Sequence, residues 1–438
     1  MGLLNKANEA LNLISPFELI GSVVSSAGVL IEANGPKVPV GSHVAILAQG
    51  KECLAQVVGF KNSNILIMPY DLVEGITLGT KVISKDSLNG VLVSDKLIGR
   101  VIDGLGNPMD EKEAILTGEK VSLYNAPPNP VTRSRIRDCF DTGVRAINGL
   151  LSIGQGQRIG IMAGSGVGKS TLLGMIARHS ESDVNVIALI GERGREVREF
   201  IEKDLGKEGL ERSVVVIATG DKSAILRIRA AFLATSIAEY FREQGKKVVL
   251  MMDSVTRLAM AQREIGLASG EPPSTKGYTP SVFAMLPKLL ERAGTCDKEG
   301  SITGLYTVLV EGDDMNEPIA DATRGILDGH IVLDRKLAGR GHFPAIDILQ
   351  SVSRVMPDVV RDEVVQNASM LRDLVATYRD NEDLITIGAY KEGQNIKVDR
   401  AVSLNDDINK FLKQKANVKC TKEEAFDMLS KIVGDMEE

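Results

Sequence analysis

A glycine-rich stretch at residues 163–171, AGSGVGKST, constrains the fold of this chain more than any other segment. It follows an apolar run at 158–162 and precedes a helical pattern of apolar residues at 172–177. Glycines let consecutive backbone N–H groups point into one concavity, and the helix behind them presents the positive end of its dipole to an anion. The order strand, loop, helix therefore predicts a phosphate-binding turn in an α/β domain, rather than an ordinary glycine-rich connection.

Different residues of the loop have different expected roles. Lys169 would reach the β- and γ-phosphates of a nucleotide, and the Ser170 hydroxyl would ligate Mg²⁺. Ala163 stands where the strict pattern has glycine, and its small side chain still allows the tight turn. The predicted nucleotide-binding residues of the loop are Ala163, Gly164, Ser165, Gly166, Val167, Gly168, Lys169, Ser170 and Thr171.

The composition is that of a globular protein and disfavours several classes of function. The 438 residues allow two or three domains, and the formal net charge of −6 leaves no general basic surface for nucleic acid. No uncharged apolar run approaches the ~18 residues of a membrane span, and the first residues lack a signal-peptide core. We therefore expect a cytosolic protein. The four cysteines and four histidines show no paired metal spacing, which predicts free, buried thiols and no zinc site.

Four regions follow one another along the chain. Residues 1–16 carry an amphipathic helical pattern, which is consistent either with a frayed terminus or with docking to a partner. Residues 17–92 alternate short β-type runs with turns, which favours a small β-barrel. Residues 93–354 hold a Gly- and Pro-rich linker and then near-continuous β runs between helical patterns, which indicate a mostly parallel sheet covered on both faces. Residues 355–438 have a helical pattern.

Three residues stand where a nucleotide-hydrolysing site needs them. Asp253 ends a buried β run, which is the form of a second Mg²⁺-side motif. Glu192 leaves another such run and is placed to orient or deprotonate a water that attacks the γ-phosphate. Arg354 closes the α/β region and could neutralise charge at a neighbouring chain's nucleotide. Taken singly, these residues could also cap a helix, stabilise a helix dipole, or form a surface ion pair.

Two further features keep alternatives open. Phe343 could stack on an adenine or pack in the core. The Pro- and Gly-rich segment at 270–281 is either a plain surface connection or a loop that moves substrate or meets a partner. Within it, Thr279 and Pro280 predict the start of a helix.

Together these motifs resemble the catalytic-chain family of rotary ATPases, and more closely its protein-export branch of flagellar and injectisome ATPases. The resemblance runs from about residue 18 to residue 358. The stretches VGFKNSNILIMPYDLVEGI and SVSRVMPDVV are more similar to the flagellar members. The motifs that carry the resemblance are AGSGVGKS, GERGREVREF, VVLMMDS, GEPPSTKGYTPS, EGDDMNEPIADATRGILDGHIVL and GHFPAIDILQSVSR.

The resemblance implies a RecA-like P-loop NTPase core with an N-terminal small β-barrel and a C-terminal helical domain. In this family pattern Glu192 matches the catalytic carboxylate, and Asp253 matches the strand-end partner of Mg²⁺. Phe343 matches the adenine-stacking aromatic, and Arg354 matches the arginine that acts in trans. Arg193, in the GERGRE motif, joins the predicted nucleotide-binding set.

The resemblance further implies Mg²⁺-dependent ATP hydrolysis coupled to export of unfolded flagellar proteins. It implies a homohexameric ring, a regulatory stator-like protein at the N-terminal helix, and contacts with an export gate, cargo and chaperones. The expected location is the cytoplasm, peripheral at the inner face of the plasma membrane. The alternatives are an injectisome ATPase, a ring RNA translocase and a noncatalytic ring subunit. Five lysines against six carboxylates and only three aromatics at 17–92 argue against the RNA translocase.

Overall fold

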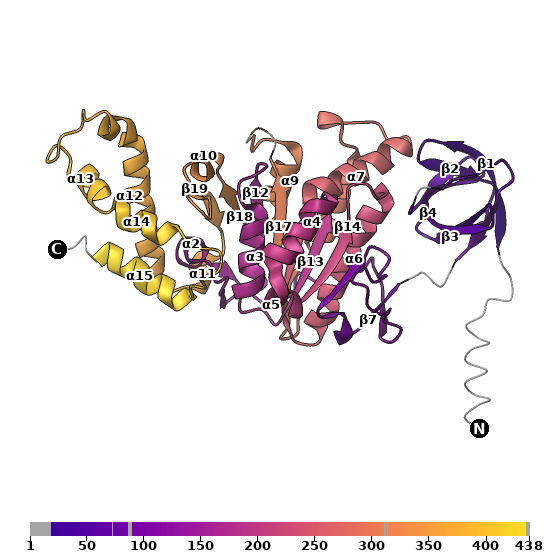
Figure 1. The fold of residues 1–438 in the computed structure, drawn as a ribbon, viewed down its shortest axis with the longest axis horizontal. Helices are drawn as coiled ribbons and strands as arrows, with labels where there is room; N and C mark the ends of the chain where they lie inside the picture. Colours follow the sequence, from indigo (N-terminus) through magenta and orange to yellow (C-terminus); the bar gives the residue numbers. More distant parts are fainter. Residues whose placement is uncertain (1–18, 72, 86–89, 311, 313, 435–438) are drawn as a thin grey trace, which may run out of the picture.

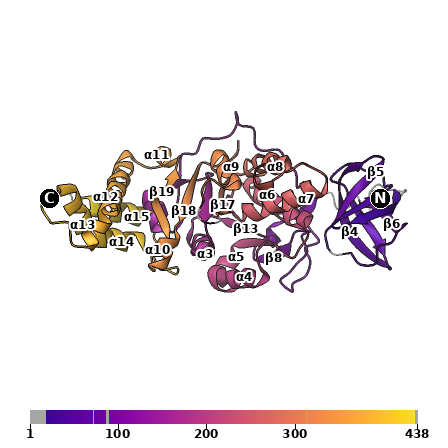
Figure 2. The same cartoon turned by 90° about the horizontal axis from the view of Figure 1, so that it is seen from above.

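Three regions lie in a row in the computed structural model, which describes residues 19–71, 73–85, 90–310, 312 and 314–434 (Figure 1). The β-barrel is at one end, the α/β domain in the middle and the C-terminal helices at the other end, and the view from above shows the same order (Figure 2). The predicted fold class is therefore confirmed. The helix predicted at 1–16 lies outside the described residues.

The barrel is closed by six antiparallel strands in the order β1-β2-β5-β4-β3-β6. Alternate side chains fill its interior, among them Ile31, Val44 and Ile67, each at most 3% exposed. All six strands fall inside the predicted range 17–92. Their bounds are β1 (Ile20–Ala27), β2 (Leu30–Ala33), β3 (His43–Ala48), β4 (Lys51–Lys61), β5 (Asn64–Pro69) and β6 (Lys81–Ser84).

The middle domain holds a sheet of nine strands. Eight follow the order β19-β18-β12-β17-β15-β13-β14-β8, and β16 pairs with β17. Neighbours are parallel except at the β18–β19 and β16–β17 pairs. The strands are β8 (Arg100–Asp103), β12 (Arg158–Ala163), β13 (Val184–Ile190), β14 (Ser213–Ala218), β15 (Lys247–Asp253), β16 (Gly294–Thr295), β17 (Ser301–Leu309), β18 (Gly329–Leu333) and β19 (Ile346–Ser353).

Helices cover both faces of this sheet because its strands are apolar on both sides. Every residue of β13 is buried; Val186 packs into one core cluster and Ile187 into the other. The stretch predicted as a linker contributes β8 to the sheet edge, and β7 (Val91–Val93) pairs with β9 (Glu119–Val121). The short strands β10 (Cys139–Phe140) and β11 (Ile153–Gly154) form a separate pair.

The helices of the middle domain begin where the local sequence supplies a start signal. Ser223 caps α6 by accepting from Leu226 N, and α8 begins at Pro280 as predicted. The helices are α2 (Arg145–Leu150), α3 (Lys169–His179), α4 (Gly194–Glu199), α5 (Gly206–Glu211), α6 (Ala224–Glu243), α7 (Val255–Ala268), α8 (Pro280–Leu290), α9 (Pro318–Ile326) and α10 (Arg335–Gly339), with a π-helical turn η3 (Phe200–Leu205) and 3₁₀ turns η2 (Asp95–Leu97) and η4 (Thr275–Gly277).

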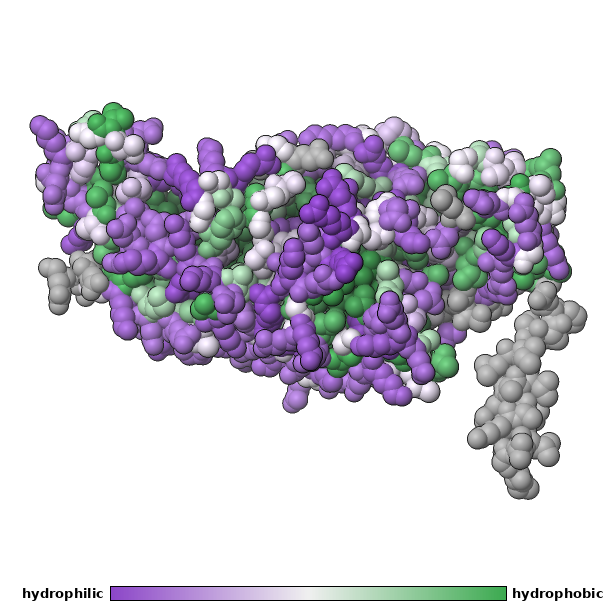
Figure 3. Space-filling view, in the orientation of Figure 1, coloured by the Kyte–Doolittle hydropathy of each residue, from purple (hydrophilic) through white to green (hydrophobic). Residues whose placement is uncertain are grey.

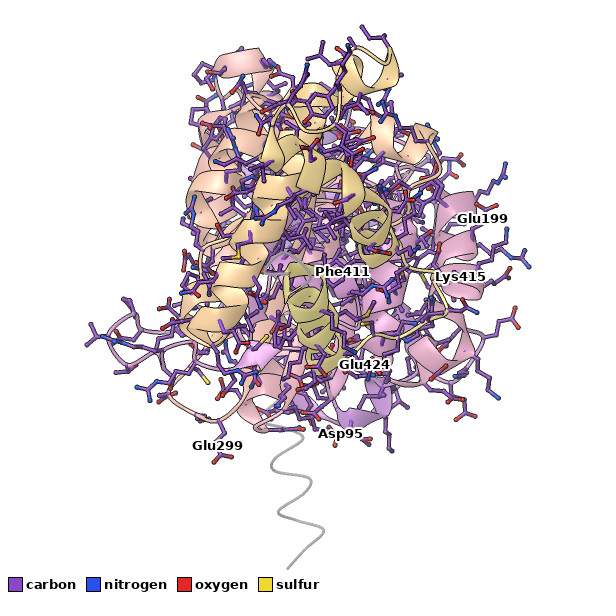
Figure 4. The ribbon with its side chains drawn as sticks, turned by 90° about the vertical axis from the view of Figure 1, so that its left-hand side faces the viewer. Asp95, Glu199, Glu299, Phe411, Lys415 and Glu424 are labelled. Carbon is purple, nitrogen blue, oxygen red and sulfur yellow. The ribbon has the colours of Figure 1, made fainter. Side chains whose placement is uncertain are left out.

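The C-terminal region is helical, and it is anchored on the middle domain through α2. Phe411 is fully buried, and a methyl group built on Gly149 of α2 would lie 2.7 Å from its ring. Figure 4 shows Phe411 among the C-terminal helices, whereas Glu199 projects from the side of the molecule. The helices are α11 (Met356–Val359), α12 (Asp362–Thr386), α13 (Ile396–Ser403), α14 (Asn405–Leu412) and α15 (Lys422–Gly434).

Polar side chains cover most of the face shown in Figure 3. Among the described residues, no helix combines the length and the apolar character needed to cross a bilayer. The four cysteines are free; Cys296 and Cys420 are buried, as predicted for all four, while Cys53 and Cys139 are only half-buried.

Candidate active site

The glycine-rich loop connects β12 to α3 and lines a cavity of about 430 Å³. Gly166 and Gly168 have φ angles of 78° and 88°, in the left-handed region that favours glycine, so these two positions let the chain turn tightly into the helix. The side chains of Ala163 and Val167 are each 1% exposed and pack in the core instead of lining the cavity. The loop residues that line it are Gly164, Ser165, Gly166, Gly168, Lys169, Ser170 and Thr171.

Three charged side chains predicted from separate motifs meet in this cavity. Lys169 Nζ lies 2.5 Å from Asp253 Oδ1 and 3.5 Å from Glu192 Oε1. Glu192 follows β13 and Asp253 ends β15, and these two strands are parallel neighbours. The carboxyl ends of parallel strands lie at one edge of a sheet, so the topology brings both carboxylates to the phosphate loop.

Burial and charge set the protonation of this cluster. Burial raises the pKa of Glu192 to about 7; Lys169 opposes this rise, and Asp253 adds to it. Apart from its 3.5 Å ion pair with Lys169, Glu192 Oε1 is buried without a hydrogen-bond partner among the described residues. Burial would lower the pKa of Lys169, but the two carboxylates outweigh that effect and raise it. Lys169 is therefore charged, while Glu192 can exchange a proton near neutral pH.

Two other predicted nucleotide contacts lie near the phosphate loop, and of these two only Arg193 is among the residues that line the cavity. Arg193 lines it, but its side chain is 80% exposed and forms an ion pair with Glu196 at 3.0 Å. Phe343 is 46% exposed, so it does not pack in the core. A methyl group built on Gly168 would lie 3.4 Å from the Phe343 ring, which places this aromatic side chain against the phosphate loop.

Arg354 lies away from its own chain's cavity. It follows β19, whose Ser353 pairs with Gly329 at the start of β18, whereas the phosphate loop begins beside Leu333 at the end of β18. Four residue steps along a strand span roughly 13 Å. The Arg354 side chain is exposed at this opposite edge, and its guanidinium donates to the carbonyl groups of Leu327 and Arg324 at 3.3 and 3.2 Å.

Comparisons with known proteins identify the family. The model of the ATP synthase alpha/beta family, nucleotide-binding domain, matches residues 143–353, and that of the T3SS EscN ATPase C-terminal domain matches residues 360–431. A flagellum-specific ATP synthase of Bacillus subtilis (strain 168) is 53% identical over 432 residues, which cover 98% of each chain. The chain belongs to the family of flagellar and type III secretion ATPases.

Solved structures of this family agree with the fold. The assembled ATPase EscN from the enteropathogenic E. coli type III secretion system matches with a TM-score of 0.89 and 47% identity, over 94% of this chain and 100% of that one. EscN in complex with its central stalk EscO matches with a TM-score of 0.88, 47% identity and the same coverage. The predicted ATPase activity and family resemblance are thereby confirmed.

Sequence reasoning missed several residues in and around the ATPase cavity. Thr307 donates to Asp253 Oδ1 at 2.7 Å, but no local motif marks it because it is recruited by the register of β17. Thr307 is fully buried and does not line the cavity, whereas Arg257 and Asp204 do. Arg257 lies four residues after Asp253, in the first turn of α7, and this spacing could have indicated that it lies near the cavity. Asp204 lies in the π-helical turn η3.

The residues present fit a Mg²⁺ ion bound together with phosphates. Ser170 and Asp253 offer a hydroxyl and a carboxylate, which are the hard oxygen donors that Mg²⁺ prefers. Within the described part of the chain, no group of three or more His, Cys, Asp or Glu could hold a metal alone. In proteins Mg²⁺ commonly takes one or two protein ligands, and water and substrate phosphates complete its coordination.

Proposed function

We propose that this ATPase uses Mg²⁺ and ATP to drive export of unfolded flagellar proteins, as a cytoplasmic ring peripheral to the inner face of the plasma membrane. The observation that carries the proposal is the meeting of Lys169, Glu192 and Asp253 at the phosphate loop. A cation, a carboxylate that can exchange a proton and a strand-end carboxylate are the parts that phosphoryl transfer to water requires.

In the proposed mechanism the backbone amides at 164–170 and the Lys169 ammonium hold the phosphates. Ser170 and Asp253 hold Mg²⁺ and its waters. When bound, Mg²⁺ neutralises charge on the phosphate oxygens. Phe343, beside Gly168, is positioned to stack on the adenine, because a half-exposed ring offers one free face.

Glu192 orients the nucleophilic water and accepts its proton. A general base works best when its pKa lies near the working pH, and the pKa of Glu192 is raised to about 7, chiefly by burial. The buried Oε1 has only its 3.5 Å ion pair with Lys169, so it can accept from that water once Lys169 holds the phosphates.

Arg354 completes the pocket of the adjacent chain in a homohexameric ring. Its exposure at the sheet edge opposite its own cavity supports a role in trans, because a head-to-tail ring presents one edge of each subunit to the pocket of the next. EscN, which is similar over nearly the whole chain, forms an assembly.

The flagellar assignment and the partners rest on similarity. The B. subtilis flagellum-specific relative is 53% identical and EscN is 47% identical. The EscN–EscO complex supports a central stalk partner for this ring as well. The remaining proposed partners are a regulatory protein at the N-terminal helix, an export gate, cargo and chaperones.

Mixing two inactive variants tests the trans role of Arg354. The E192Q chain still has Arg354, and the R354A chain still has Glu192. An interface in which an R354A chain forms the pocket and an E192Q chain is its neighbour therefore has both groups. Random assembly of a 1:1 mixture forms roughly a quarter of its interfaces in this way. We expect each variant alone to lose hydrolysis and the mixture to regain a fraction of it. A mixture as inactive as its components would overturn the proposal.

A further inference from the structure

The carboxylate of Asp253 is held by two donors at a single oxygen atom. Lys169 Nζ lies 2.5 Å from Asp253 Oδ1, and Thr307 Oγ1 donates to the same Oδ1 at 2.7 Å. Asp253 is 4% exposed, and the described residues form no hydrogen bond to its Oδ2. One oxygen is therefore fully engaged, and the other is available to a ligand.

The position of Thr307 follows from the register of the sheet. β15 and β17 run parallel with Met252 beside Tyr306, so the next pair sets Asp253 beside Thr307. Thr307 is fully buried on a central strand, where its β-branched side chain has little rotational freedom. Its Oγ1 also lies 3.2 Å from the Met252 carbonyl, but the single hydroxyl proton points to the shorter contact with the carboxylate.

Nucleotide binding affects the two donors differently. In the proposed function Lys169 moves its hydrogen bonds to phosphate oxygens, and Asp253 then loses its cationic partner. Thr307 cannot leave, because it is part of the sheet. Among the described residues, Thr307 alone would then keep Oδ1 occupied and the carboxylate plane fixed, which leaves Oδ2 for the metal.

We propose that Thr307 is a positioning residue for the Mg²⁺ site and determines how tightly Mg²⁺ binds with nucleotide. Partners that hold a metal-ligating carboxylate typically contribute 10- to 100-fold to metal affinity. The inference rests on the proposed function, since it requires that Asp253 serve Mg²⁺.

Calorimetric titration of the full chain with ADP, in EDTA and in MgCl₂, tests the inference without turnover. We expect T307V, which keeps the shape but removes the donor, to bind metal-free ADP as the wild type does. Its gain in ADP affinity on adding Mg²⁺ should fall by about 10- to 100-fold. T307S, which restores a hydroxyl, should recover most of that gain.

Thr303 provides a matched control on the same face of β17. It is 1% exposed, and its hydroxyl accepts from Gly156 N at 2.9 Å, at the other end of the strand. T303V should therefore bind Mg²⁺ and ADP like the wild type. If T307V does not fold by circular dichroism, T307A removes the hydroxyl without adding bulk and carries the same test.

D253N separates the two possible failures. If D253N loses the Mg²⁺-dependent gain and T307V keeps it within twofold of the wild type, the role of Thr307 is wrong while the metal role of Asp253 stands. If D253N also keeps the gain, the proposed metal site itself is wrong.

Discussion

Two buried clusters in the middle domain each contain both positive and negative side chains. They differ in how completely their polar atoms are paired. Arg292 is fully buried and donates to both carboxylate oxygens of Glu239, at 2.8 and 2.6 Å. It also donates to the Leu123 carbonyl and the Ser236 hydroxyl, and Asn125 donates to Glu239. We call this cluster closed because the charged atoms of Arg292 and Glu239 are all paired. It fixes the linker against α6 and α8.

The cluster around Lys169 is open by comparison. Apart from the 3.5 Å ion pair with Lys169, Glu192 Oε1 lacks a hydrogen-bond partner among the described residues, and the three charged groups line a cavity of about 430 Å³. A buried charge therefore does not by itself mark a site. What marks it is a set of charged groups whose remaining hydrogen-bonding capacity points into a cavity that can admit a ligand.

The largest expected effect in this comparison is on turnover. E192Q should reduce ATP hydrolysis by about 10²- to 10⁴-fold, because glutamine cannot accept a proton from the attacking water. ATP affinity should change by only a few-fold, since Lys169 and the loop amides are intact. Steady-state hydrolysis together with equilibrium ATP binding measures both quantities. Normal hydrolysis by E192Q would refute the catalytic role.

Breaking the closed cluster should change the stability of the protein rather than its turnover. R292M leaves the Glu239 charge buried without its partner, and we expect the free energy of unfolding to fall by about 3–5 kcal/mol. Urea unfolding measures this, and the KM for ATP of the folded fraction should not change. The double variant R292M/E239L should recover most of the loss because no charge is left unpaired. An equally large loss in the double variant would contradict this explanation.

The smallest expected effect is a pH-dependent gain in stability. Burial raises the pKa of Glu192 from its ordinary 4.5 to about 7, so between these values the folded chain binds a proton that the unfolded chain has lost. Stability therefore falls as pH rises through this window, and the full cost is present above pH 7. E192Q removes that cost. Thermal unfolding without nucleotide should show a higher Tm for E192Q at pH 8 and a smaller difference at pH 5. Equal Tm differences between E192Q and the wild type at both pH values would contradict this explanation.

Much of the fold could be predicted because apolar periodicity reports burial directly. The apolar run before Glu192 predicted a buried strand, and this strand is β13 (Val184–Ile190). The edge strand β8 was not predicted, because its four residues lie in a Gly- and Pro-rich stretch and gain their strand conformation by pairing with β14. Of the candidate site, the loop, Glu192 and Asp253 each follow an apolar run, so their places at the carboxyl edge of the sheet could be predicted.

The sequence by itself determined the phosphate loop, the alternation of strands and helices, and the identity of the charged groups at the strand ends. These are local properties, set by neighbouring residues along the chain. The tertiary structure alone decided that Thr307 meets Asp253, that burial raises the pKa of Glu192, and that Arg354 lies at the edge opposite its own cavity. Strand order, register and burial depend on residues far apart in sequence, and no local pattern encodes them.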